Sequence, residues 1–337
     1  MNSSSDIDIK KRGGSPWVLP EDSAHARPVA RLRYTHRRTP TPETAVARIT
    51  PEGPNAQQIE YWNEISGDKW VAMNDVIDAQ IEPLGSAAID HAGVRTGERV
   101  LDVGCGCGQT TLQLAARVGS TGAVRGVDIS APMLARAQER VDAAGAAHVE
   151  LDNVDAQTTA FDPEFDLVFS RFGVMFFAEP ERAFANLLSA LRPGGRLTWV
   201  TWQALPRNPW MLVPVSAAAK HLPPMDPPDP EAPGPFALAD ADRTERLLAA
   251  AGFEDIAHGP LERELLVGGG GDLDETVGFV LQLGPLGAAL REAAAEVRAA
   301  AAHDVRTALE PYFVEGADGR GVRMPAAAWL VTAKRPA

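Results

Sequence analysis

The chain has 337 residues, of which 45% are apolar and 23% charged, as is typical of globular proteins, and it holds no apolar run near the about 18–20 residues of a membrane helix. The amino terminus lacks the apolar segment of a secretory signal, so we expect no export. Residues 1–50 carry nine Lys/Arg and five Asp/Glu, whereas the remainder carries 23 basic and 40 acidic residues, which disfavours nucleic acid as a partner.

Residues 1–50 are rich in Ser, Thr, Pro and Arg and show no sustained apolar period. This composition predicts a disordered extension. A basic interaction arm, a targeting peptide and a gene start placed too far upstream are the alternatives. Acidic residues weaken the targeting alternative, namely Asp6, Asp8, Glu21 and Asp22.

The character of the chain changes at Asn55, where apolar residues begin to recur at helical spacings. The pattern is interrupted near Gly67 and Pro83. It predicts two or three amphipathic helices within residues 51–97.

Residues 98–202 alternate between short apolar runs and helical stretches. The expected strands are 99–104, 123–129, 148–156, 165–172 and 195–202, and the expected helices are 109–118, 131–144 and 180–191. Strand–helix alternation of this kind predicts an α/β fold with a parallel sheet covered on both faces. Ligands bind such sheets beyond the carboxyl ends of the strands.

The pattern loosens after Trp202. The stretch "HLPPMDPPDPEAPGPF" at 221–236 contains seven prolines and predicts a loop. A helix at 240–251 and a strand at 255–267 follow. The glycines of 268–271 predict a hinge into a helical, Ala-rich insert at 272–314, and the last strand is expected at 326–335.

The stretch "LDVGCGCGQTT" at 101–111 raises the question of which ligand the chain binds. A dinucleotide fingerprint would need glycine where Gln109 stands, and no Gly-Lys-Ser/Thr follows as in a phosphate-binding loop. Cys105 and Cys107, the only cysteines, cannot complete a four-ligand zinc site and form no disulfide framework. We expect both to be small spacers in a crowded glycine turn, and the protein to be cytoplasmic.

Three acidic residues stand near the ends of the predicted strands. Asp102 stands two residues before the first glycine and suits a ligand with an ammonium group. Asp128 ends the second strand, where a carboxylate can accept both hydroxyls of a ribose. Asp155 ends the third strand and is placed to accept a proton from the amino group of adenine.

Five ordered motifs carry a family resemblance: "VLDVGCGCGQTT", "GVDIS" followed by "PML", "VDAQ", "FDLVFSRFGVMFF" and "LRPGGRLTWVTW". In these motifs residues 98–202 resemble the class I S-adenosylmethionine-dependent methyltransferases, in the small-molecule group that includes the ubiquinone/menaquinone C-methyltransferases. The resemblance implies a Rossmann-like, mostly parallel seven-stranded sheet flanked by helices, with helical lid additions at both ends. It also implies one methyltransferase domain over 51–337, made of N-terminal helices (51–97), a cofactor-binding core (98–202) and substrate-side elements (203–337).

The resemblance implies that S-adenosylmethionine is the cofactor and S-adenosylhomocysteine the product. Asp102 and the backbone of Gly104, Cys105, Gly106 and Gly108 would hold the methionine end, with Gln109 and Thr110 near its carboxylate. Asp128 would hold the ribose, Ile129 and Met133 would pack on the adenine, and Asp155 would read the adenine amino group with Ala156 beside it. Ser170, Arg171 and Phe172 would lie between cofactor and acceptor. Core packing is the alternative for Ile129 and Met133.

Methyl transfer from a sulfonium is an in-line displacement for which the enzyme supplies alignment and exclusion of water. No residue is marked as a general base, and His221 is only a weak candidate. The expected acceptor is a small organic molecule with apolar surface, since the Asn/Asp-Pro-Pro-aromatic motif of nucleic-acid amino-methyltransferases is missing. Its pocket would be lined by aromatic residues, drawn from Tyr61, Trp62, Trp70, Phe172, Phe176, Phe177, Trp202 and Trp210.

Two other functions stay open from the sequence. One is a cofactor-binding sensor or assembly partner without transferase activity. The other is a nicotinamide-dependent oxidoreductase, which Gln109 and Asp102 disfavour. The scaffold does not choose among carbon, oxygen and nitrogen as the methylated atom.

Overall fold

The computed structural model describes residues 48–224, 229–316 and 319–337. Its strands are β1 (Arg99–Val103), β2 (Ala123–Asp128), β3 (Val149–Asn153), β4 (Phe165–Arg171), β5 (Leu191–Trp202), β6 (Glu254–Val267), β7 (Phe313–Gly316) and β8 (Gly319–Lys334). Its α-helices are α1 (Ala56–Glu60), α2 (Gly67–Ala72), α3 (Asn74–Ala92), α4 (Gln109–Val118), α5 (Ala131–Ala144), α6 (Pro180–Ala190), α7 (Pro209–Ala218), α8 (Ala241–Ala251), α9 (Leu273–Val280), α10 (Gly284–Arg291) and α11 (Ala295–Leu309).

One mixed sheet organises these elements. Its strand order is β3-β2-β1-β4-β5-β8-β6, and β7 pairs with β8 outside this path. The first five strands run parallel, whereas β8 is antiparallel to β5, β6 and β7. The seven strands of the path confirm the predicted Rossmann-like sheet, and β7 is an eighth strand that the sequence pattern does not predict.

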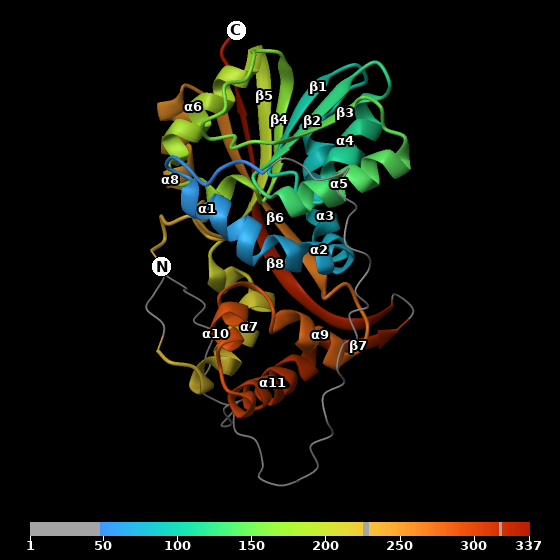
Figure 1. Cartoon of the computed structure of the whole chain (residues 1–337), viewed down its shortest axis with the longest axis vertical. Helices are drawn as coiled ribbons and strands as arrows, with labels where there is room; N and C mark the ends of the chain where they lie inside the picture. Colours follow the sequence, from blue (N-terminus) through green and yellow to red (C-terminus); the bar gives the residue numbers. More distant parts are fainter. Residues whose placement is uncertain (1–47, 225–228, 317–318) are drawn as a thin grey trace, which may run out of the picture. The chain divides into compact units, whose positions relative to one another are not determined.

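Helices cover both faces of the parallel part of the sheet. Figure 1 shows α3, α4 and α5 on one face and α6 and α8 on the other. The buried strands are mostly apolar; in β4, Leu167 and Phe169 are fully buried. Strands covered on both faces lose the period-2 alternation of half-exposed strands, which explains why β1 and β4 read as continuous apolar runs.

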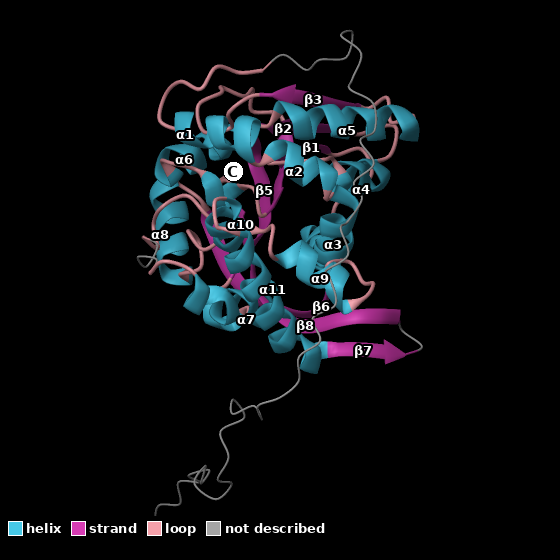
Figure 2. Cartoon of the chain, turned by 60° about the horizontal axis from the view of Figure 1, so that its bottom comes forward, coloured by secondary structure: helices cyan, strands magenta, loops and turns pink. Residues whose placement is uncertain are grey.

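A group of helices lies beyond the carboxyl end of β5. Trp202, the last residue of β5, pairs with Ala328, so β8 before Ala328 and the carboxyl half of β6 extend past the parallel strands. The helices α7, α9, α10 and α11 gather beside this extension (Figure 2). The end of the sheet where ligands bind such folds is therefore also the end that carries the helical insert.

Most predicted elements are confirmed, and α4 and α5 match their predicted ranges to the residue. The insert predicted as helical over 272–314 ends sooner, because Phe313 begins β7, and β8 begins at Gly319 instead of at residue 326. Helix α7 was not predicted. The predicted extension, residues 1–50, lies outside the described residues except for 48–50.

The break predicted near Pro83 is wrong. Helix α3 continues through Pro83, and the chain breaks instead at Met73, between α2 and α3. An internal proline removes one helical hydrogen bond and crowds the preceding turn. The buried face of α3, which includes the fully buried Leu84, offsets this cost by packing against the core.

Replacing Pro83 by Ala should therefore raise the free energy of unfolding by about 1–3 kcal/mol, because alanine favours the helix and restores the backbone hydrogen bond that proline cannot make within α3. Thermal or urea unfolding followed by circular dichroism measures the change. Pro180→Ala is the matched control: Pro180 begins α6, where its missing N–H has no helical partner to lose, so no gain is expected. An unchanged or lower stability of Pro83→Ala would show that α3 needs its proline.

Candidate functional site

The glycine loop after β1 touches the loop after β4. Gly104, Gly106 and Gly108 all have positive φ, at 68°, 56° and 80°. A Cβ added at Gly104 would lie 2.6 Å from Cα of Gly173, closer than such atoms approach in proteins. Glycine is thus required here for the backbone angle and for the close approach of two chain segments.

The two cysteines belong to this loop, between its glycines, and are both buried and free of disulfide bonds. Burial raises the pKa of the Cys107 thiol to about 12 and that of Cys105 well above its ordinary value. A thiol acts as a nucleophile or metal ligand only when it is ionised, so these positions are unsuited to either role. Within residues 48–224, 229–316 and 319–337, no three His, Cys, Asp or Glu side chains gather as metal ligands.

Asp102 lies at the end of β1 and is fully buried. Its Oδ2 accepts hydrogen bonds from the hydroxyls of Thr110 at 2.9 Å and Thr111 at 2.6 Å, while its Oδ1 has no partner. Burial raises the pKa of this carboxyl, and the two threonine hydroxyls oppose the rise. The sequence pattern marked Thr110 but not Thr111, although both anchor the same oxygen.

Asp128 ends β2 beside the glycine loop, as predicted from its position. Its two carboxylate oxygens accept the backbone N–H groups of Gly106 and Ser130, each at 2.8 Å. Burial raises the pKa of Asp128 to about 6, although these backbone hydrogen bonds oppose the rise. Met133 is buried, and its Cε lies 2.9 Å from the position of a Cβ on Gly106. Ile129 is partly exposed next to Asp128.

Asp155 lies beyond the end of β3 and is 7% exposed. Its Oδ1 accepts the backbone N–H of Gln157 at 2.9 Å and the side-chain amide of Asn55 at 3.2 Å. Ala156, also buried, accepts a hydrogen bond from Asn186 through its carbonyl oxygen. The end of β3 therefore carries the third carboxylate in a row with Asp102 and Asp128.

Residues 170–172 connect β4 to the rest of the site. Ser170 donates its hydroxyl to the carbonyl of Val103 at 2.7 Å, which fixes the end of β4 against the end of β1. Phe172 has a φ of 63°, rare for a residue with a side chain, and its ring stacks on Trp202 at 4.1 Å between centroids. The strained backbone thus turns an aromatic ring toward the end of β5.

Arg171 and Gln109 belong to an ion-pair network that the sequence did not reveal. Arg171 donates to Gln109 Oε1 and, at 3.2 Å, to Asp78 of α3. Arg140 of α5 donates to the other oxygen of Asp78 at 2.7 Å and to the carbonyl of Cys107 at 3.0 Å. One buried carboxylate on α3 therefore ties the start of α4, the end of β4 and α5 together.

Residues 48–66, which we call the strap, lie across the carboxyl ends of β2 and β3. The backbone N–H of Ile49 bonds to Asn153 Oδ1 at 2.8 Å. Asn63 donates to the carbonyl of Ile129 at 2.8 Å and accepts from the N–H of Ala131 at 3.0 Å. The strap contains α1 and the π-helical turn Tyr61–Ile65. No helical or strand period marks these asparagines, so the sequence pattern does not indicate a role for them.

His221, the weak candidate for a base, lies at the end of the turn after α7. Its Nε2 bonds to Asp304 of α11, which also pairs with Lys220 at 3.0 Å. Both interactions join the turn after α7 to α11. Within the described residues, neither His221 nor Asp304 bonds to the glycine loop.

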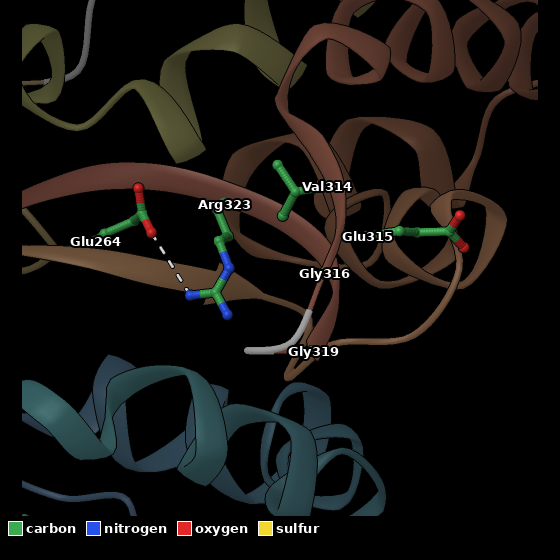
Figure 3. A pocket seen from close by; sticks show the side chains of 6 residues that line it. All are labelled: Glu264, Val314, Glu315, Gly316, Gly319 and Arg323. Atoms are coloured by element: carbon green, nitrogen blue, oxygen red, sulfur yellow. Dashed lines mark hydrogen bonds and ion pairs between the residues drawn. The ribbon is translucent and has the colours of Figure 1, made fainter.

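A surface groove of about 280 Å³ lies at the β7–β8 hairpin (Figure 3). Its lining includes Glu264 and Arg323, 3.5 Å apart, together with exposed hairpin residues. None of the residues predicted to hold the cofactor lines it. This groove is therefore separate from the site at the strand ends.

The residues at the strand ends fit the predicted cofactor. S-adenosylmethionine presents donor groups along its length: an ammonium, two ribose hydroxyls and the adenine amino group. The site offers carboxylates at the ends of three neighbouring strands, and buried acceptor atoms of Asp102 and Asn55 have no partner. The donor groups of the cofactor would give these buried acceptor atoms the hydrogen-bond partners that they lack.

Comparison with known proteins places these observations in a family. The methyltransferase domain family matches residues 100–195. Aklanonic acid methyltransferase DauC of Streptomyces sp. (strain C5) is 35% identical over 149 residues, which cover 42% of this chain and 67% of that protein. Ubiquinone/menaquinone biosynthesis C-methyltransferase UbiE of Pseudomonas savastanoi pv. phaseolicola is 36% identical over 151 residues, which cover 44% of this chain and 59% of that protein.

Solved structures show the same fold. Haemonchus contortus phosphoethanolamine N-methyltransferase 2, in complex with phosphomonomethylethanolamine and S-adenosylhomocysteine, superposes with a TM-score of 0.52 at 19% identity, covering 85% of this chain and 61% of that chain. No helix in the described ranges is both long enough and apolar enough to span a membrane.

Changing Asp102 to Asn should weaken S-adenosylhomocysteine binding roughly 10- to 150-fold, the equivalent of about 1.5–3 kcal/mol for a charged hydrogen bond. The amide keeps an acceptor for Thr110 and Thr111 but removes the negative charge. Isothermal titration calorimetry measures the affinity. The double variant Cys105→Ala with Cys107→Ala is the comparison and should bind within about threefold of the unchanged protein, since neither thiol is placed to contribute charge. Abolished binding in a folded double variant would contradict this assignment.

If Asp128 holds the ribose as predicted, cofactor affinity should also fall as the pH drops through about 6, because this carboxylate then gains a proton and becomes a weaker acceptor. Folding raises the pKa of this carboxyl, so the group itself favours the folded state as the pH falls from 6 to 4 and does not cause unfolding in that range. Calorimetric titrations between pH 5 and 8 test this. Asp128→Asn should bind weakly with a flatter profile; an unchanged profile in that variant would assign the pH dependence to another group.

Proposed function

The chain belongs to the S-adenosylmethionine-dependent methyltransferases, and we propose that it methylates a small organic acceptor with aromatic or other apolar surface. Aromatic side chains beside the glycine loop are the observation that carries this proposal. Phe172 stacks on Trp202, and Trp202 contacts Trp210 with 5.3 Å between ring centroids. Phe172 directly precedes Gly173, which touches Gly104 of the cofactor loop.

A second aromatic group lies on the N-terminal side. Trp62 of the strap contacts Trp70 of α2 at 5.4 Å and Phe176 at 5.3 Å, both edge to face. Phe172 and Phe176 both stand in the segment after β4, so the two aromatic groups flank the same few residues. The first group is buried and the second is partly exposed, and an aromatic lining of this kind would favour a flat apolar acceptor over a polar one.

The names of the relatives support the same class of acceptor. One is named for methylating aklanonic acid and the other for C-methylation in ubiquinone/menaquinone biosynthesis. The alignments span 67% and 59% of these proteins, and the segment after residue 202 of this chain, which carries α7 to α11, is the part that would select its own acceptor.

The cofactor supplies an electrophilic methyl group on a positively charged sulfur, and the chain supplies alignment. The glycine loop and Asp102 would fix the methionine end, Asp128 the ribose and Asp155 the adenine. The ring of Phe172 would bound the acceptor, and the buried Trp202 behind it keeps water away. Positioning of this kind is worth about 7–11 kcal/mol of the barrier. No described side chain is assigned as a general base, and His221 is engaged by Asp304.

We propose one methyltransferase domain over 51–337, with N-terminal helices at 51–97, the cofactor-binding core at 98–202, and substrate-side and lid elements plus the last strands at 203–337. We further propose that the enzyme is cytoplasmic. We also propose that it does not act on nucleic acid, because the chain carries a net charge of −13. The acceptor can be identified by incubating the enzyme and isotope-labelled S-adenosylmethionine with cell extract, followed by mass spectrometry. A labelled small molecule supports the proposal; tight cofactor binding without any labelled product across extracts and aromatic acceptors would favour a sensor.

Replacing Trp202 by Phe should raise the KM for the acceptor about three- to tenfold, because the stacked contact with Phe172 shrinks by about 0.5–1.5 kcal/mol. Cofactor affinity should stay within about twofold. Trp199→Phe is the matched control on the same strand: Trp199 points to the opposite face, against Phe184, and should affect stability alone. Steady-state kinetics with the identified acceptor decide this; equal effects of both variants on KM would remove Trp202 from the acceptor wall.

A further inference from the structure

Asn55 is a buried polar residue with an unused hydrogen-bond acceptor. It is 2% exposed and lies in the strap, immediately before α1. Its Nδ2 donates to Asp155 Oδ1 at 3.2 Å, whereas its Oδ1 has no partner. The orientation of the amide is fixed by chemistry, since the flipped amide would set an oxygen against the carboxylate of Asp155.

The unused oxygen has no structural role in α1. Asn55 stands at the N-cap position, where asparagine side chains commonly accept a hydrogen bond from the helix backbone, but here no such bond forms. A buried acceptor without a partner costs about 1–3 kcal/mol. A residue that only anchored the strap would not need to leave that oxygen unpaired.

The carboxylate of Asp155 has one crowded oxygen and one open oxygen. Its Oδ1 already accepts from Asn55 and from the backbone N–H of Gln157. Its Oδ2 has only a long contact of 3.4 Å with the hydroxyl of Thr158. Two acceptors are therefore available on joined side chains, Oδ2 of Asp155 and Oδ1 of Asn55. An adenine amino group has two hydrogens to donate.

The strap holds Asn55 in place independently of Asp155. Ile49 bonds to the end of β3 on one side of it, and Asn63 bonds to the segment after β2 on the other. The hydroxyl of Ser130 adds a bond to the carbonyl of Trp62 at 2.9 Å. Asn55 is thus fixed across the ends of the two strands that carry Asp128 and Asp155.

We propose that Asn55 is a specificity-determining residue that accepts one hydrogen of the 6-amino group of the cofactor's adenine, while Asp155 accepts the other. This proposal rests on the proposed function, since it requires S-adenosylmethionine at the strand ends. It assigns a role in recognition to the strap, which lies outside the segment, residues 100–195, that matches the family.

The proposal makes a distinction between two nucleobases. Hypoxanthine carries an oxygen in place of the 6-amino group, so it would set an acceptor against both Asn55 Oδ1 and the carboxylate of Asp155. A site that pairs with a donor group rejects an analogue that lacks it, because the buried acceptors are left unpaired. The ratio of affinities for S-adenosylhomocysteine and S-inosylhomocysteine therefore reports on Asn55 directly.

The test is calorimetric titration of the full chain with both compounds. For Asn55→Ala, S-adenosylhomocysteine should bind about tenfold more weakly, the size expected for one buried neutral hydrogen bond, while S-inosylhomocysteine should change less than threefold. The selectivity ratio should fall about three- to tenfold. Asn55→Ser is the second variant, because its short hydroxyl reaches neither partner and gives the same expectation if the alanine variant does not fold.

Asn74→Ala is the matched control. Asn74 is also a buried asparagine of the N-terminal helices, 5% exposed, but it bonds to Asp75 and Arg136. Its removal should leave the selectivity ratio unchanged. A purely structural role of Asn55 would weaken both compounds equally, and an unchanged ratio in Asn55→Ala overturns the proposal. If the unchanged protein bound neither compound, the proposed function itself would fail, an outcome distinct from loss of selectivity.

Discussion

The close approach of Gly104 and Gly173 is the constraint on which the site depends. Strands β1 and β4 are neighbours in register, with Asp102 opposite Phe169, so both chains leave the sheet at the same level and meet. Only glycine at both positions lets the two backbones touch. On one side of this contact the chain turns into α4 and exposes the loop backbone. On the other side the strained Phe172 turns its ring onto Trp202. This one backbone contact thus fixes the position of the glycine loop relative to the stacked rings of Phe172 and Trp202.

Charge at the site is arranged in two ways. The carboxylates at the strand ends, Asp102, Asp128 and Asp155, are held by hydroxyl, amide and backbone donors that carry no formal charge. Within the described residues none of the three forms an ion pair; the charge of Arg171 acts on Asp102, but burial outweighs it and raises the pKa of Asp102, and burial also raises the pKa of Asp128. The arginines behave differently, because Arg140 and Arg171 are both paired with Asp78. The strand ends therefore offer negative charge to a cationic ligand, whereas the nearby arginines are held in ion pairs between helices and strands.

The sequence predicts the parts of this protein where local pattern and ligand chemistry coincide. The strand ends with Asp102, Asp128 and Asp155, the glycine turn and the helices after them follow from apolar runs and breakers. The helix through Pro83 was mispredicted, because tertiary packing overrides a local penalty. The Asp78 network and the strap asparagines could not be predicted, since they pair residues 62 to 104 positions apart. Such pairings depend on how α3 and the strap dock, which no periodicity encodes.

The strap is the segment that lies across the carboxyl ends of β2 and β3. It is joined to the strand ends by a handful of hydrogen bonds from Ile49, Asn55, Asn63 and Ser130, each worth about 0.5–1.5 kcal/mol. The central strands β1 and β4 are mostly buried, and buried core strands open at free energies close to that of global unfolding. Because Asp155 is buried under the strap and the side chain of Asn55 is buried within it, an adenine could reach both acceptors only if the strap lifted. Pairing the two unused acceptors with the cofactor would then favour the closed form, so that cofactor binding and exclusion of water from the methyl group become one event.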